Sequence, residues 1–210
     1  MSRTSIVVMA RWPAPGRCKL RLADSLGFVT AAKVQKRLTA HTLSVVSKAR
    51  QRSSIKLHLA VNGLGPSAAA RWGASSGADQ TWLQGCGNLG MCMRRVLLKL
   101  QRGAKLDPRV ILIGTDLPSL VEADLEEAIR ALHHRSIVLG PSADGGYWLL
   151  GLGGDLLRPL AIWPFASIPW GTDAVLDAML RRAYQVGLKP VLLSGRQDLD
   201  RVTDLASWLR

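Results

Sequence analysis

One apolar run that ends in glycine, threonine and aspartate constrains the fold more than any other segment. Residues 110–113 are a continuous run of valine, isoleucine and leucine, followed by Gly114, Thr115, Asp116 and, two residues on, Pro118. A run without polar alternation is typical of a parallel strand buried on both faces, and Pro118 cannot extend it. Because open α/β sheets bind ligands beyond the carboxyl ends of their strands, we expect Thr115 and Asp116 at a ligand site. The alternative is that Asp116 only caps the next turn.

Strand-like and helix-like segments alternate along the rest of the chain. Strands are expected at residues 5–10, 55–61, 80–83, 110–113, 136–140, 147–152 and 190–193. Helices are expected at residues 30–52, 67–73, 91–100, 122–133 and 172–186, with a short final helix at 206–210. This alternation predicts an α/β fold with a mostly parallel sheet built from βαβ units.

Turn-forming residues set the boundaries late in the chain. Three prolines exclude a long helix from residues 155–170. Thr172 or Asp173 is the expected N-cap of the next helix, and Gly187 is its expected stop.

Bulk composition limits the class of protein. With 210 residues, the chain is long enough for one well-cored domain over residues 1–210. Hydrophobic residues at 48% and charged residues at 20% exclude a disordered or fibrous chain. No stretch offers the roughly 20 apolar residues of a membrane span, so we expect a cytoplasmic protein without a membrane partner. Three cysteines without paired spacing indicate reduced thiols rather than a disulfide or zinc framework.

The formal charge of +13 indicates an anionic ligand, and phosphates are the natural candidate. The cations are spread over several segments instead of forming one tail or helix stripe, and aromatic residues make up only 5%. No RNA-binding sheet motif or recognition helix accompanies the charge, so nucleic-acid binding is the weaker alternative.

A cationic loop is expected directly after the first strand. Residues 11–22 contain four cations, and Pro13, Pro15 and Gly16 exclude helix at the start of this segment. Because the loop lies at the ligand edge of the sheet, we interpret it as a phosphate-binding loop. The alternative is a solvated basic loop.

Two glycine-rich segments could bring backbone close to a ligand. Residues 84–90 precede a helix, and Asp144 precedes Gly145 and Gly146 in a turn. A plain hairpin turn explains the second segment almost as well. The chain has no Walker motif, which disfavours a P-loop NTPase.

Five segments together resemble a known family. Residues 9–22 (MARWPAPGRCKLRL), 113–120 (IGTDLPSL) and 139–152 (LGPSADGGYWLLGL) look like signature blocks of the DUF2064 family, and residues 84–90 (QGCGNLG) and 198–205 (DLDRVTDL) resemble two further blocks in the same order. That family is placed in the nucleotide-diphosphosugar (GT-A) transferase superfamily and includes glycosyltransferases of arsenosugar biosynthesis. The resemblance implies a Rossmann-like GT-A three-layer α/β/α sandwich, with the nucleotide over the first half of its sheet.

The same resemblance implies a metal-dependent glycosyltransferase that uses a nucleotide-sugar donor, a small-molecule acceptor, and Mg²⁺ or Mn²⁺. The implied metal ligands are Asp116 with Asp198 or Asp200, although the last two could instead cap the final helix. The implied catalytic residues are Asp116, Lys19, Arg21 and Asp144. The implied nucleotide-binding residues are Ala10, Arg11, Gly16, Arg17, Gly87, Asn88, Thr115, Gly145 and Gly146. Asp144 would orient or deprotonate the acceptor hydroxyl, in a pocket walled by Trp148 and Trp170.

Two further readings stay open. The first block is also similar to that of phospholactate-type guanylyltransferases, which would make the chain a nucleotidyltransferase that uses a nucleoside triphosphate. Leu20, Asn88 and Cys92 stand where the DUF2064 pattern has threonine, aspartate and arginine. These departures put donor preference and activity in question, and they favour the third alternative, a basic nucleic-acid-binding protein on a degenerate transferase fold. The sequence leaves the oligomeric state open.

Overall fold

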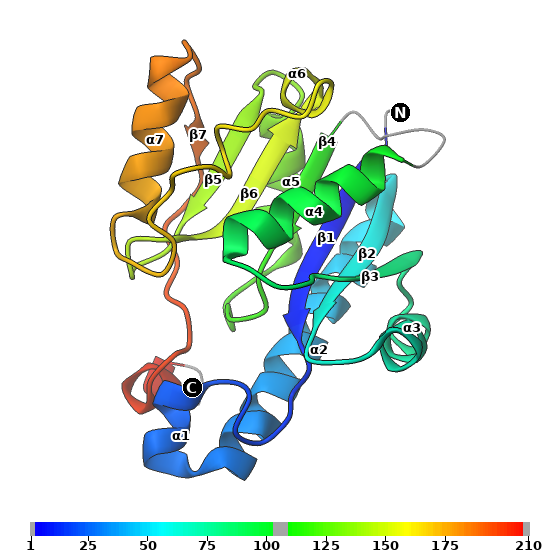
Figure 1. The fold of residues 1–210 in the computed structure, drawn as a ribbon, viewed down its shortest axis with the longest axis vertical. Coiled ribbons are helices and arrows are strands. Elements are labelled where there is room, and N and C mark those ends of the chain that lie inside the picture. Colours follow the sequence, from blue (N-terminus) through cyan, green and yellow to red (C-terminus); the bar gives the residue numbers. More distant parts are fainter. Residues whose placement is uncertain (1–2, 103–108, 208–210) are drawn as a thin grey trace.

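A seven-stranded sheet forms the middle of the molecule within residues 3–102 and 109–207, the part that the computed structural model describes (Figure 1). Its strand order is β3-β2-β1-β4-β6-β5-β7. The strands are β1 (Thr4–Arg11), β2 (Ile55–Asn62), β3 (Gln80–Leu83), β4 (Arg109–Ile113), β5 (Ile137–Pro141), β6 (Tyr147–Gly153) and β7 (Val191–Leu192). Strand β6 runs antiparallel to its neighbours β4 and β5, and the other pairings are parallel.

Helices cover both faces of this sheet. They are α1 (Leu20–Leu26), α2 (Phe28–Arg52), α3 (Pro66–Ser75), α4 (Leu89–Gln101), α5 (Glu122–Ala131), α6 (Gly154–Leu157) and α7 (Val175–Gln185), and a 3-10 helix η1 (Val202–Ser207) follows. One face packs against α2, α3 and α5, and the other against α4, α6 and α7. Within β1, Ile6 and Val8 join the first core and Val7 joins the second. The predicted three-layer α/β/α sandwich with a mostly parallel sheet is therefore confirmed.

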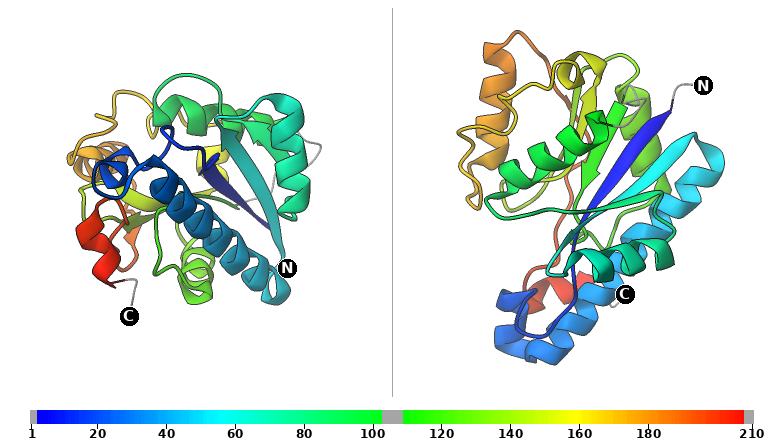
Figure 2. Two further views of the ribbon diagram at one scale, coloured as in Figure 1. Left: turned by 90° about the horizontal axis from the view of Figure 1, so that it is seen from below. Right: turned by 45° about the vertical axis from the view of Figure 1, so that its right-hand side comes forward.

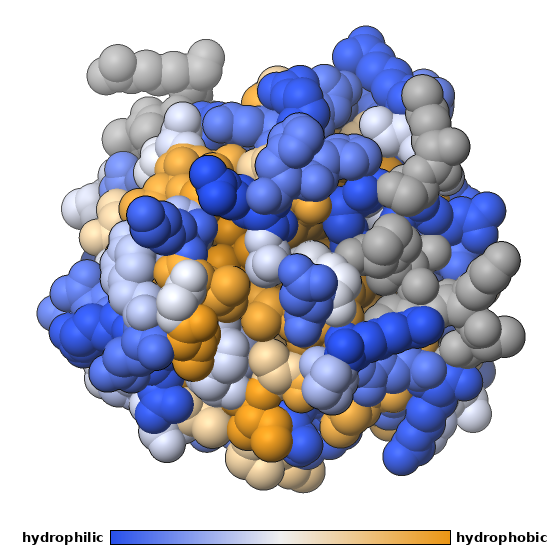
Figure 3. Space-filling view, turned by 90° about the horizontal axis from the view of Figure 1, so that it is seen from above, coloured by the Kyte–Doolittle hydropathy of each residue, from blue (hydrophilic) through white to orange (hydrophobic). Residues whose placement is uncertain are grey.

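The strand directions determine where a ligand can meet the sheet. Strands β1, β4, β5 and β7 all end at the lower edge in Figure 1, where β6 begins. Figure 3 views the opposite end, where hydrophilic residues surround an apolar area. None of the described helices is both long and apolar enough to cross a membrane.

Three local expectations need correction, and one alternative is confirmed. Strands β5 and β6 form the plain hairpin that was the alternative for the turn at Asp144, because residues 142–146 turn the chain directly back. Helix α7 begins at Val175 with Ala174 as N-cap, so the predicted cap at Thr172 or Asp173 is wrong. The Thr172 hydroxyl instead donates to the Pro169 carbonyl at 2.8 Å and accepts from the Ala174 amide at 3.3 Å.

The last two corrections concern α1 and the C-terminus. The cationic loop ends in a helix, because Leu22 and Ala23 pack with Leu38 of α2 and with Leu199. Figure 2 shows α1 beside the C-terminal segment. The expected final helix begins earlier, as η1, and its predicted end at 208–210 lies outside the described residues.

Candidate functional site

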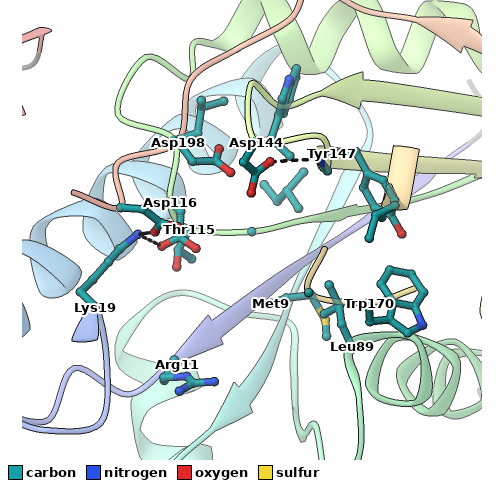
Figure 4. Close-up of a pocket in the computed structure, with 18 of the residues that line it drawn as sticks. Met9, Arg11, Lys19, Leu89, Thr115, Asp116, Asp144, Tyr147, Trp170 and Asp198 are labelled. Carbon is teal, nitrogen blue, oxygen red and sulfur yellow. Dashed lines mark hydrogen bonds and ion pairs between the residues drawn. The ribbon is translucent and has the colours of Figure 1, made fainter. Parts of the chain in front are cut away.

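A cavity of about 900 Å³ opens at the carboxyl edge of the sheet. Among the described residues, those that line the cavity lie at the ends of β1 and β4, at the start of β6 and in the C-terminal segment. Figure 4 shows side chains that line it. Of the predicted site residues, the lining includes Arg11, Lys19, Arg21, Thr115, Asp116, Asp144, Gly146, Asp198 and Asp200. It does not include Ala10, Gly16, Arg17, Gly87, Asn88 or Gly145. The expected edge therefore holds a cavity in which four of the predicted aspartates and three of the predicted cations meet.

Lys19 connects the first loop to two of these aspartates. Its Nζ lies 2.7 Å from Asp116 Oδ1 and 2.9 Å from Asp200 Oδ1, and it also donates to the Leu199 carbonyl. The Lys19 side chain is only 4% exposed, whereas those of Asp116 and Asp200 are 45% and 40% exposed. Burial of the Lys19 ammonium opposes its charge, but the two carboxylates outweigh this effect and hold its pKa above the ordinary value. The Lys19 ammonium is therefore charged, and it contacts Asp116, Asp200 and the Leu199 carbonyl at the same time.

The backbone of Lys19 is held in a conformation that non-glycine residues seldom adopt. Lys19 is the N-cap of α1 with φ 48° and ψ 48°, in the left-handed region. This geometry turns the chain from the proline-rich loop into α1. The following residues Leu22 and Ala23 are then buried, and their packing fixes the position from which Lys19 reaches Asp116.

The segment after β7 is tied to the rest of the site by backbone hydrogen bonds. The Arg196 amide donates to the Pro141 carbonyl at 3.0 Å, and the Leu199 amide donates to the Asp116 carbonyl at 2.8 Å. The Arg196 guanidinium forms an ion pair with Asp124, a buried residue of α5. These bonds bring Asp198 and Asp200 to the cavity that Asp116 lines, and their role as metal ligands stays a prediction.

Asp198 has the most perturbed carboxyl in the cavity. Its pKa is raised to about 7, chiefly by burial and also by the negative charges of Asp116, Asp144 and Asp200, while the Ser142 hydroxyl that donates to it at 2.8 Å acts in the opposite direction. A carboxyl with such a pKa is poised to exchange a proton for a cation near neutral pH.

The donor set fits a hard divalent cation. Lys19 Nζ contacts one oxygen of Asp116 and one of Asp200, so these two carboxylates already converge on a positive charge. Within the described chain, no three histidine, cysteine, aspartate or glutamate side chains are arranged to hold a metal ion. Mg²⁺ and Mn²⁺ need only one or two carboxylates when phosphate oxygens and water complete the shell. Asp116 and Asp200, with Asp198 beside them, therefore suit such an ion.

The cationic loop contributes two further side chains to the cavity. Arg11 Nη1 donates to the Arg17 carbonyl at 3.0 Å, which folds the loop over itself. Arg21 is 64% exposed, and its Nη1 lies 3.6 Å from Asp200 Oδ2. The guanidinium groups of Arg11 and Arg21 are thus available to phosphates, and the exposed Leu20 lies between Lys19 and Arg21.

The glycine-rich segment before α4 has a clear role inside the fold. Asn88 Oδ1 accepts a hydrogen bond of 3.0 Å from the Met91 amide, which caps α4. Cys92 is buried, with Sγ 3.7 Å from the Gly85 carbonyl and 3.9 Å from that of Gly87. Of the three departures from the family pattern, Asn88 therefore caps helix α4 and Cys92 packs beneath the same glycine-rich segment. A nucleotide contact at Gly87 or Asn88 stays a prediction.

The opposite half of the cavity is aromatic and acidic. Tyr147 and Trp170 pack edge to face with ring centroids 6.3 Å apart, and Trp170 lies near Met9 and Leu89 (Figure 4). Trp148 also lines the cavity, but most of its side chain is buried in the sheet core. Asp144 is exposed, and its Oδ1 accepts from the Gly146 amide at 3.0 Å.

Gly145 has a packing role on this side. Its φ is +83°, and a Cβ there would overlap the Asp173 carbonyl oxygen. The Gly145 carbonyl also accepts a hydrogen bond of 2.9 Å from the Leu176 amide. These contacts hold the β5–β6 turn against the start of α7.

Two glutamines at the cavity were missed by the sequence reasoning. Gln35 of α2 is buried, and its Nε2 donates to the Thr115 hydroxyl at 2.9 Å, which orients the residue before Asp116. Gln84 follows β3, and its Nε2 donates to the Ala60 carbonyl at 2.8 Å. Gln35 interrupts the apolar stripe of its helix, and this polar residue at a core position was the available signal.

Comparisons with known proteins agree with this geometry. The sequence profile of a family described as "Uncharacterized protein conserved in bacteria (DUF2064)" matches residues 45–172. A search of curated proteins finds none that matches the chain.

Three solved structures share the fold. A provisionally named nucleotide-diphospho-sugar transferase from Desulfovibrio desulfuricans G20 is 25% identical over 98% of this chain and 87% of its own, with a TM-score of 0.81. CMP:2-keto-3-deoxy-manno-octonic acid synthetase, solved with CTP, is 12% identical over 98% of this chain and 96% of its own, with a TM-score of 0.59. Rv0371c of Mycobacterium tuberculosis H37Rv, solved with manganese, is 18% identical over 100% of this chain and 98% of its own, with a TM-score of 0.52. The expected fold class, the GT-A-like one, is confirmed.

Proposed function

The chain belongs to the DUF2064 family, and on that premise we propose that it is a metal-dependent glycosyltransferase, which moves a sugar from a nucleotide-sugar donor to a small-molecule acceptor. The division of charge in the cavity carries this proposal. Among the described lining residues, the cations are Arg11, Lys19 and Arg21, all from one segment of the chain. The half around Tyr147 and Trp170 has aspartates and apolar side chains instead. The first half attracts a diphosphate, and the second suits an acceptor without negative charge.

The donor diphosphate is proposed to lie between the cationic loop and Asp116. Asp116, with Asp198 or Asp200, would hold Mg²⁺ or Mn²⁺, which when bound would neutralise the phosphates. Lys19 and Arg21, helped by Arg11, balance the charge that develops on the departing nucleoside diphosphate, because such transfers depend mainly on positioning and electrostatics.

The acceptor is proposed to enter beside Asp144. Its hydroxyl oxygen attacks the anomeric carbon of the sugar, its proton passes to the Asp144 carboxylate, and the nucleoside diphosphate leaves with the bonding electron pair. Tyr147 and Trp170 supply an apolar wall for the carbon face of the acceptor, a role that aromatic rings commonly have.

Nucleotidyl transfer is the second candidate, because a protein of the same fold was solved with CTP. In that reaction an acceptor oxygen attacks the α-phosphate of a triphosphate and releases pyrophosphate. The phospholactate-type acceptor is an anion, and the described lining near Asp144 and Asp173 offers it no lysine or arginine. This observation favours sugar transfer.

A thermal-shift panel separates the candidates. A selectively bound ligand stabilises the folded state by mass action, so the protein is heated with nucleotide sugars and nucleoside triphosphates, each with and without Mn²⁺. Sugar transfer predicts stabilisation by a nucleotide sugar plus Mn²⁺ and little by any triphosphate. The reverse pattern would favour nucleotidyl transfer, and stabilisation by RNA alone would refute both enzyme readings.

A further inference from the structure

Lys19 occupies the position that the proposed metal ion needs. Its Nζ lies 2.7 Å from Asp116 and 2.9 Å from Asp200, the carboxylates assigned to that ion. It also donates to the Leu199 carbonyl, so the described contacts account for all three ammonium protons. An ammonium so placed cannot also bind the donor phosphates, although the proposed function requires it to do so.

The net charge at Asp116 and Asp200 indicates where the Lys19 side chain lies once a metal ion has bound there. Two carboxylates and one ammonium leave a net charge of −1, and the same carboxylates with a divalent ion are neutral. An ammonium that stayed beside the new ion would be strongly repelled, because the Lys19 side chain is only 4% exposed and little solvent screens it. The side chain must therefore leave Asp116 and Asp200.

The backbone conformation of Lys19 explains why its side chain lies against Asp116 and Asp200 in the metal-free protein. The left-handed conformation at φ 48° is costly for a residue with a Cβ, and such outliers gather at sites where the surroundings enforce them. Burial of α1 on one side and the bond to Leu199 on the other hold Lys19 against the carboxylates.

From these contacts we infer that Lys19 is an exchangeable counter-ion of Asp116 and Asp200, which a divalent metal ion displaces and which only then becomes a ligand of the donor phosphates. The inference rests on the proposed function, since it assigns the metal to the same carboxylates. It makes Lys19 an antagonist of metal binding in the free protein, although the same residue assists the reaction. Because the released ammonium needs a new anion, metal and diphosphate strengthen each other's binding.

Mn²⁺ binding to the Lys19→Met variant tests the exchange. Free Mn²⁺ is measured by electron paramagnetic resonance, without nucleotide, for the native protein and the variant. Methionine keeps the apolar stem and removes the charge, so we expect Mn²⁺ to bind at least about tenfold more tightly. Lys48→Met is the matched control, because it removes one charge from a side chain that is 66% exposed and pairs with Glu122 outside the cavity. We expect its affinity to stay within about twofold of the native value.

A measurement on the native protein covers the case in which Lys19→Met does not fold. Acetic anhydride acetylates accessible amines, and peptide mass spectrometry reports the rate at each lysine. Without metal, Lys19 should react much more slowly than Lys48, because it is buried and triply bonded. Saturating Mn²⁺ should raise the Lys19 rate several-fold and leave the Lys48 rate unchanged.

The outcomes distinguish this inference from the proposed function. If the native protein binds Mn²⁺ but Lys19→Met binds it no more tightly, or if bound Mn²⁺ leaves acetylation of Lys19 unchanged, the exchange is refuted and the metal-dependent transferase stands. If neither protein binds Mn²⁺, the exchange and the metal assignment are both refuted.

Discussion

The Ser142 hydroxyl donates a hydrogen bond of 2.8 Å to Asp198 Oδ2 and so joins the β5–β6 turn to the segment that follows β7. This bond offsets only part of the cost of burying the charge, because the pKa of Asp198 still rises to about 7. An asparagine at this position could accept the same bond without carrying a charge.

The first prediction concerns pH. The folded-state pKa of Asp198 lies above the unfolded value, so its contribution to stability is fully present below about pH 4 and is lost as pH rises through about 7. The unfolding free energy of Asp198→Asn, relative to that of the native protein, should therefore be higher at pH 8.5 than at pH 5. Because solvent reaches part of this side chain, we expect a difference of about 1–2 kcal/mol. Urea unfolding with EDTA at both pH values measures it, and an equal difference at the two pH values would contradict the assignment.

The second prediction concerns Asp116. Asp116→Asn keeps the side-chain shape but removes the carboxylate charge that pairs with Lys19 and that we propose as a metal ligand. We expect the Mn²⁺-dependent part of nucleotide binding, measured by calorimetry, to weaken by at least about tenfold. EDTA should have the same effect on the native protein. Unchanged binding in the variant would remove Asp116 from the site.

The third prediction concerns turnover. Lys19→Ala removes the cation that we assign to the donor phosphates, and we expect the rate of sugar transfer to fall by more than about tenfold. Unfolding midpoints are measured in parallel, because Lys19 also bonds to Leu199 and Asp200. Loss of stability with full activity would give the loop a structural role only.

The fourth prediction concerns Gly145. Gly145→Ala places a Cβ against the Asp173 carbonyl at a φ of +83°, and we expect a loss of about 2–3 kcal/mol in the free energy of unfolding. Gly146→Ala is the matched control, because its Cβ would meet only the end of the Asp144 side chain, at 3.1 Å. Equal losses in the two variants would show that the backbone contact at Gly145 is unimportant.

The fifth prediction concerns Arg196. Arg196→Met leaves the buried Asp124 carboxylate without its cation, so we expect a loss of about 2–4 kcal/mol in stability and weaker metal-dependent nucleotide binding. Arg50→Met is the control, because Arg50 pairs with Asp79 at 2.7 Å but is 40% exposed, and its loss should cost less than about 1 kcal/mol. Similar costs in the two variants would mean that the Arg196 pair does not fasten the C-terminal segment.

The sequence by itself determined the layers of the fold and the edge at which its site lies. The apolar runs at β1 and β4 could be read directly, because burial on both faces of a sheet leaves no polar alternation. The position of Asp116 followed from the glycine and proline around it. Strand ends that point the same way share an edge, so Arg11 and Asp116 could be expected near one another.

Tertiary structure alone decided which side chains meet there. The bond between Lys19 and Asp200 joins residues 181 positions apart, and the bond between Gln35 and Thr115 spans 80 positions. Helix α1 forms where prolines and cations predicted only a loop, because Leu22 gains burial against Leu199. Local patterns record periodicity and turn chemistry. They do not record which distant residues pair with a buried charge, and here those residues, Asp116 and Asp200, determine where the Lys19 ammonium lies.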